Sequence, residues 1–224
     1  MLPGFRIKAV ISGMVNLYLV RHGRQSSALC NVDVDLSEEG RMQADLLRRR
    51  LGNYSIDALY SSNLLRARQT AEILNESLGL EHYIREELRE ISFGALEGHT
   101  DEYIEEHFAG FKAEQKRMAE DIPYPEGENG TSVYERAMPV IQEIIQSGKK
   151  NILVVTHGGT IRVLVAALFG RSQASRFHFG VSLENTGITQ LVYHPEYDRF
   201  YLERFNDYAH LEGHEKLYRS NWCG

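Results

Sequence analysis

Runs of hydrophobic residues alternate along the chain with segments in which hydrophobic residues recur every three or four positions. The runs predict strands at 15–20, 57–60, 82–85, 152–155, 187–193 and 200–205. The recurring pattern predicts helices at 37–51, 64–78 and from 133 to about 144, followed by an almost wholly apolar helix at 159–169. This order is typical of βα units. We therefore predict an α/β fold with a mainly parallel central sheet and helices on both of its faces.

Residues from about 92 to 130 interrupt this alternation. They are acidic, they contain Pro123 and Pro125, and they carry a polar helical pattern over 101–120. We predict that this insertion forms a helical lid over the edge of the sheet. No linker or repeat divides the chain, so we predict one domain over 1–224, in which 1–13 is either an N-terminal arm or an artefact of an upstream start.

The composition of the chain indicates which cellular compartment and which kinds of partner to expect. The 25 Lys and Arg residues against 31 Asp and Glu give a formal charge of −6, which argues against a nucleic-acid partner. No apolar run is long enough to span a membrane, and the N-terminal stretch lacks the features of a signal peptide. The two cysteines, Cys30 and Cys223, cannot form a disulfide framework. We expect a reduced, cytoplasmic protein without a membrane partner.

Histidine and arginine side chains follow two of the predicted strands. One strand ends in Arg21-His22-Gly23, and a later one ends in Thr156-His157-Gly158. In a parallel sheet, both histidines emerge at the carboxyl edge, where loops build ligand sites. Arg66 lies at the start of a helix that begins at this same edge, and both guanidinium groups and helix N-termini favour anions. The sequence therefore predicts a phosphate site at this edge.

These residues belong to a longer set of motifs that follow one another along the chain: Arg21-His22-Gly23, Leu36-Ser37-Glu38-Glu39-Gly40, Ser61–Ala71, Leu88-Arg89-Glu90, Gly94-Ala95-Leu96-Glu97-Gly98 and Thr156-His157-Gly158-Gly159. Two weaker motifs follow at Asn206-Asp207 and His210-Leu211. The ordered set resembles the histidine phosphatase superfamily, which contains the cofactor-dependent phosphoglycerate mutases.

The resemblance implies a role for each of five residues. His22 is the expected nucleophile, which becomes phosphohistidine, while Arg21, Arg66 and His157 clamp the phosphoryl oxygens and Glu90 gives a proton to the leaving group. Phosphoryl transfer depends mainly on positioned charge, and a neutral imidazole is nucleophilic near pH 7. The resemblance implies neither a cofactor nor a metal. The expected partner is a small phosphorylated metabolite, and the oligomeric state is left open.

The sequence departs from the family pattern in the loop after His22. Arg24, Gln25 and Ser26 are the candidate substrate-loop residues, although the family's usual acidic or amide residue, hydroxyl and asparagine are out of frame here. Arg68 is expected at the surface or behind Arg66. Four further residues carry reactive side chains but are not expected to take part in the chemistry. Glu128 is expected to be an exposed acid in a loop, and Cys30 a small pocket or surface residue. His210 and His214 have a spacing that metal sites use, but no third ligand accompanies them.

Three functions follow, in order of preference. The first is a phosphatase that hydrolyses small phosphomonoesters through phosphohistidine on His22. The second is a mutase, which returns the phosphoryl group to a second hydroxyl of the substrate. The third is a phospholigand-binding protein without turnover, which the joint presence of His22, Glu90 and His157 argues against.

Overall fold

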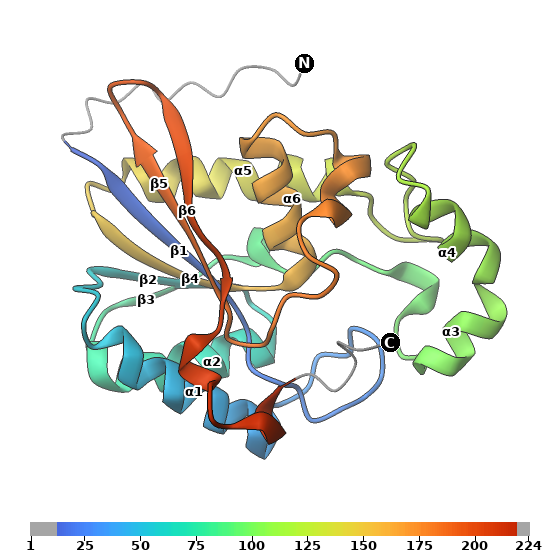
Figure 1. Cartoon of the computed structure of the whole chain (residues 1–224), viewed down its shortest axis with the longest axis horizontal. Coiled ribbons are helices and arrows are strands. Elements are labelled where there is room, and N and C mark those ends of the chain that lie inside the picture. Colours follow the sequence, from blue (N-terminus) through green and yellow to red (C-terminus); the bar gives the residue numbers. More distant parts are fainter. Residues whose placement is uncertain (1–12, 219–224) are drawn as a thin grey trace.

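A single six-stranded sheet forms the centre of the molecule (Figure 1). The computed structural model describes residues 13–218, so Cys223 and all of the predicted arm except Gly13 lie outside the described residues. The strands lie side by side in the order β3-β2-β4-β1-β5-β6. Their bounds are β1 Val15–Arg21, β2 Ala58–Ser61, β3 His82–Ile84, β4 Asn151–Thr156, β5 Ile188–His194 and β6 Arg199–Asp207.

The sheet is mixed but mostly parallel. β1 pairs with β4 in parallel, and β2 pairs in parallel with both β3 and β4. The last two strands form a hairpin whose first arm, β5, lies antiparallel to β1. The prediction of a mainly parallel α/β sheet is therefore confirmed, with an antiparallel hairpin at one side. The carboxyl ends of β1, β2 and β4 meet at one edge.

Helices cover both faces of the sheet, as predicted. Alternate residues of β1 face opposite sides: Leu17 and Leu19 join the cluster that contains α5 and α6, while Val20 joins the cluster that contains α1 and α2. Strands buried on both faces need apolar residues at every position, which explains the unbroken hydrophobic runs of β1 and β4. The helices are α1 Glu38–Leu51, α2 Leu65–Leu78, α3 Asp101–His107, α4 Ala109–Lys116, α5 Gly130–Gln146 and α6 Gly158–Leu168.

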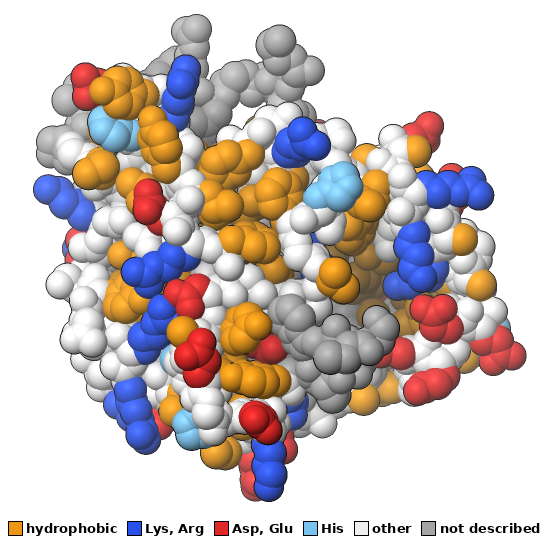
Figure 2. Space-filling view, in the orientation of Figure 1, with side chains coloured by type: hydrophobic (Ala, Val, Ile, Leu, Met, Phe, Trp, Pro, Cys, Tyr) orange, Lys and Arg blue, Asp and Glu red, His pale blue; other side chains and the backbone are white. Residues whose placement is uncertain are grey.

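The segment predicted as a lid contains two short helices, α3 and α4, which lie within the polar helical stretch predicted over 101–120. The chain leaves the helical conformation at Phe108, between α3 and α4. This break allows Phe108 and Phe111 to pack against a third apolar cluster around Ile104 and Tyr124. Figure 1 shows α3 and α4 to one side of the sheet, and Figure 2 shows the surface hollowed between them and the body of the protein. Closure of this segment over a ligand stays a prediction.

None of the helices between residues 13 and 218 is long and apolar enough to cross a membrane.

Candidate active site

Strand register brings His22 and His157 together. Arg21 at the end of β1 is paired with Thr156 at the end of β4, so the next residue of each strand is a histidine. The two imidazole rings lie 5.0 Å apart between centroids. His22 is 4% exposed and His157 is 0% exposed. The two His-Gly strand ends of the sequence therefore meet in one buried place.

Two hydrogen bonds determine the tautomer of His22. Its Nδ1 lies 2.7 Å from the carbonyl oxygen of Gly23, and a carbonyl can only accept. Its Nε2 lies 3.2 Å from Nε of Arg66, and a guanidinium can only donate. The proton therefore sits on Nδ1, and Nε2 carries a lone pair. A neutral imidazole in this state has a nucleophilic nitrogen directed at the Arg66 side of the site.

Arg66 supplies a buried positive charge beside this nitrogen. It lies in the first turn of α2 and is 2% exposed. Its terminal nitrogens donate to the backbone oxygen of Val32 at 3.0 Å and to Oδ1 of Asn31 at 2.7 Å. Burial lowers the pKa of the guanidinium, and the nearby Glu90 opposes that shift. Arg66 forms no ion pair within the described part of the chain, so an anion would satisfy a charge that neutral groups now hold.

The imidazole of His157, which lies beside that of His22, is kept in its neutral form by burial. Burial lowers its pKa well below the usual range, and the positive charge of Arg66 adds to this effect. Its Nε2 lies 2.8 Å from the hydroxyl of Ser62, which follows β2 and also accepts the N–H of Leu64. Its Nδ1 is buried and has no hydrogen-bond partner among the described residues. A buried polar atom without a partner costs free energy that a bound ligand can recover.

Glu90 lies at the N-terminus of α6. Its carboxylate accepts hydrogen bonds from the backbone N–H groups of Gly159 at 3.2 Å, Thr160 at 3.1 Å and Ile91 at 2.9 Å. A Cβ at position 159 would come within 2.5 Å of Oε1, so glycine is needed for this approach. The same carboxyl group that the family motif marks as a proton donor thus also caps a helix.

Backbone contacts fix the strand end that carries His22. The N–H of His22 donates to the carbonyl of Thr156 at 2.9 Å, and the side-chain amide of Asn185 donates to the carbonyl of His22 at 2.8 Å. The guanidinium of Arg21 lies beside Gly158 and donates to the carbonyl oxygen of Leu183. Arg21, Arg66, His22, His157 and Glu90 are thus all placed at the carboxyl edge of the sheet.

The three candidate substrate-loop residues point to other contacts. Arg24 donates to the backbone oxygens of Leu217 at 3.3 Å and Tyr218 at 2.8 Å. The side chain of Gln25 donates to two carbonyls of its own loop, and the N–H of Ser26 bonds to Asp35. The side chains of Arg24 and Gln25 are thus held by backbone carbonyls, and contact of Arg24, Gln25 or Ser26 with a substrate stays a prediction.

Sequence reasoning missed Asn31, Ser62 and Asn185. Asn31 adopts a left-handed conformation with φ of 48°, and its amide bridges Arg66 and Glu97. No motif in the sequence singles out Asn31. Ser62 lies inside the Ser61–Ala71 motif, and its position directly after β2 could have predicted a place at the carboxyl edge of the sheet. Nothing in the hydrophobic pattern singled out Asn185.

The residues set aside in the sequence have ordinary partners. Arg68 is exposed, with its guanidinium 3.9 Å from Glu72, and Glu128 is half-buried in an ion pair with Arg136 at 2.8 Å. His210 bonds to the hydroxyl of Thr186 at 2.9 Å. Burial raises the pKa of Cys30 to about 11, so its thiol stays protonated. Among residues 13–218, no group of three or more His, Cys, Asp or Glu side chains could hold a metal ion.

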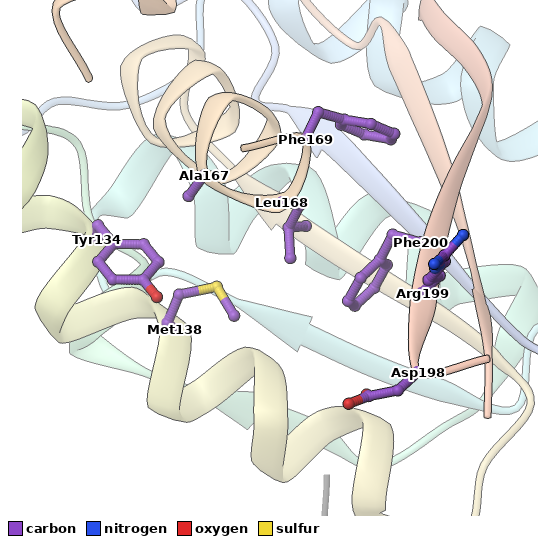
Figure 3. Close-up of a pocket in the computed structure, with 8 residues that line it drawn as sticks. All are labelled: Tyr134, Met138, Ala167, Leu168, Phe169, Asp198, Arg199 and Phe200. Carbon is purple, nitrogen blue, oxygen red and sulfur yellow. The ribbon is translucent and has the colours of Figure 1, made fainter. Parts of the chain in front are cut away.

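A separate cavity of about 360 Å³ lies elsewhere, lined by Tyr134, Met138, Ala167, Leu168, Phe169, Asp198, Arg199 and Phe200 (Figure 3). It touches the end of α6, whereas His157 precedes the start of that helix. Eleven helical residues separate the two places by roughly 16 Å. The cavity therefore contains none of the residues that the sequence motifs single out.

The fold and this cluster define a class: an α/β protein with a buried histidine and arginine site at the carboxyl edge of its sheet. Comparison with known sequences gives the family. The sequence model of the histidine phosphatase superfamily (branch 1) matches residues 17–208. The chain therefore belongs to the histidine phosphatase superfamily.

Individual relatives carry the names of both phosphatases and mutases. "Phosphoserine phosphatase 1" of Hydrogenobacter thermophilus is 30% identical over 210 residues, which cover 88% of this chain and 95% of that protein. "Probable phosphoglycerate mutase GpmB" of Yersinia pestis is 29% identical over 213 residues, which cover 89% and 96%. The structure of mycobacterial glucosyl-3-phosphoglycerate phosphatase with inorganic phosphate has a TM-score of 0.79 at 30% identity, covering 88% of this chain and 99% of that one.

Proposed function

We propose that this protein hydrolyses small phosphomonoesters through a phosphohistidine intermediate on His22. The observation that carries the proposal is the hydrogen bonding of His22, which leaves a lone pair on Nε2 next to the buried guanidinium of Arg66. The family membership and the phosphatase names of two relatives support it.

In the first step, the Nε2 lone pair attacks phosphorus while the P–O ester bond breaks. The electron pair of that bond goes to the leaving oxygen, which takes a proton from Glu90. Positive charge builds on the ring, and the bond from Nδ1–H to Gly23 stabilises it. Arg66, Arg21 and the unpartnered Nδ1 of His157 are the groups proposed to face the phosphoryl oxygens.

In the second step, water attacks phosphorus and the P–N bond breaks. The electron pair of that bond returns to Nε2, and Glu90 takes the proton from the water. No cofactor or metal takes part in the proposed steps.

A mutase returns the phosphoryl group to a second hydroxyl instead of to water, and the mutase name of the Yersinia relative keeps this alternative in place. The assay is incubation with 3-phosphoglycerate, with and without bisphosphoglycerate, and measurement of both free phosphate and the 2-isomer. We expect phosphate release. Isomer formation without phosphate release would favour the mutase over the phosphatase. Binding of the substrate without formation of either product would favour a phospholigand-binding protein without turnover.

The substrate class is tested with a panel of phosphorylated sugars, amino acids and nucleotides. A His22→Ala variant serves as the control, because release that survives this substitution does not come from the proposed nucleophile.

A further inference from the structure

One peptide group determines which nitrogen of His22 carries the proton. The carbonyl of Gly23 and the N–H of Arg24 belong to the same planar peptide. The carbonyl accepts from Nδ1 of His22 at 2.7 Å, and the N–H donates to Oε1 of Gln43 at 2.8 Å. Gln43 therefore fixes the orientation of the Gly23–Arg24 peptide group, and the carbonyl of that same group accepts the hydrogen bond from His22.

Gln43 itself is locked in one orientation. It lies on α1, it is 0% exposed, and its amide nitrogen donates to the carbonyl of Leu217 at 2.7 Å. Because one end faces a donor and the other an acceptor, the two ends of the amide cannot exchange. The buried side chain of Gln43 thereby ties the C-terminal segment to the Gly23–Arg24 peptide, alongside the hydrogen bonds that the Arg24 guanidinium donates to Leu217 and Tyr218.

Close packing of α1 against this loop makes the contact possible. A Cβ at Gly23 would come within 2.5 Å of the carbonyl oxygen of Gly40, and a Cβ at Gly40 within 2.1 Å of the carbonyl oxygen of Arg24. Glycine at both positions brings the helix to backbone contact, which puts Gln43 within reach of the peptide. This arrangement buries the polar side chain of Gln43 in the apolar face of α1, next to Ala44 and Leu47, and such burial costs free energy unless the side chain is hydrogen-bonded.

We infer that Gln43 is a positioning residue for the nucleophile: it fixes the Gly23–Arg24 peptide so that His22 keeps its proton on Nδ1 and its lone pair on Nε2. Hydrogen bonds in series polarise one another, so the bond to Gln43 also strengthens Gly23 as an acceptor. The inference rests on the proposed function of His22 as the nucleophile.

The test compares Gln43→Leu and Gln43→Glu with Gln173→Leu. Gln173 is also a buried glutamine that donates to a backbone carbonyl, that of Val163, but it has no link to His22. Two readouts are used: the tautomer of His22 from long-range nitrogen–proton NMR spectra of the unliganded protein, and kcat and KM for p-nitrophenyl phosphate.

In Gln43→Leu we expect His22 to become a mixture of tautomers and kcat to fall by about 10- to 100-fold with little change in KM, the range seen for hydrogen-bond partners that orient metal-binding histidines. Gln173→Leu should change neither readout. In Gln43→Glu, a protonated carboxyl reproduces both hydrogen bonds, so its kcat relative to the unsubstituted protein should rise as the pH falls.

An unchanged His22 tautomer and kcat in Gln43→Leu would overturn the inference. If that variant does not fold, Gln43→Glu decides, and a pH-independent kcat ratio overturns the inference. The tautomer is measured without turnover. A protein that shows the tautomer change but hydrolyses no phosphomonoester would therefore contradict the proposed function and leave the role of Gln43 standing.

Discussion

The two roles of Glu90 can be separated by Glu90→Gln. As a helix cap, the carboxylate accepts three backbone N–H groups, two at Oε1 and one at Oε2. A glutamine keeps the oxygen that accepts from Ile91 and Thr160, but its NH₂ group faces the N–H of Gly159. The substitution loses one charge-assisted hydrogen bond, which costs about 1.5–3 kcal/mol of the free energy of unfolding.

As the proposed proton donor, Glu90 should contribute much more to the turnover of some substrates than of others. An alkyl phosphate has a poor leaving group and needs the proton, so loss of a general acid lowers kcat by about 10²- to 10⁴-fold. The p-nitrophenolate ion leaves as a stabilised anion and needs little help. We therefore expect Glu90→Gln to lose the alkyl activity and to keep most of its activity on p-nitrophenyl phosphate.

The assay measures kcat on both substrates alongside thermal unfolding. Glu128→Gln is the matched control, because Glu128 also accepts a backbone N–H, that of Ser92 at 2.9 Å, and pairs with Arg136. It should lose stability with no dependence on the leaving group. Equal loss on both substrates in Glu90→Gln would refute the proton-donor role and leave only the helix cap.

Three further predictions follow from the same contacts. Phosphate at 100 times its dissociation constant should stabilise the protein by about 2.7 kcal/mol, and Arg66→Met should abolish that gain in a thermal shift assay; a retained gain would place phosphate elsewhere. Gly159→Ala should reproduce the selective loss of Glu90→Gln, because its Cβ would lie 2.5 Å from Oε1 of Glu90; equal loss on both substrates would count against this. Burial lowers the pKa of His210 from 6.5 to about 4. The unfolded chain then binds the proton first, so stability should fall from about pH 6.5 to about pH 4, and His210→Gln should flatten that part of the denaturation profile; an unchanged profile would show that His210 is not the group responsible.

The sheet and its flanking helices were predictable because their signals are periodic. β1 and β4 are unbroken apolar runs, and each is followed directly by a histidine and a glycine, so parallel pairing alone brings His22 and His157 together. The start of α2 likewise places Arg66 at that edge. These contacts depend only on elements that the hydrophobic pattern determines.

The remaining contacts depend on loop conformation, which that pattern does not encode. Asn31 reaches Arg66 through a left-handed residue in an irregular loop, and Asn185 reaches His22 from the turn before β5. The break at Phe108 accompanies packing of its ring against an apolar cluster that includes Tyr124, which is distant in the sequence. Gln43 had a signal: it is a polar residue at a buried position of an otherwise apolar helix face, and such a residue must find a partner.

The central claim is that a phosphoryl group is transferred to Nε2 of His22. The most direct test is to mix the protein with a radiolabelled phosphomonoester, to quench the reaction rapidly without acid, and to locate the label. The account predicts a base-stable, acid-labile label on the peptide that contains His22, formed within the first turnover and absent from His22→Ala. A fully active protein that carries no label in this peptide, or that carries the label on another residue, would contradict it.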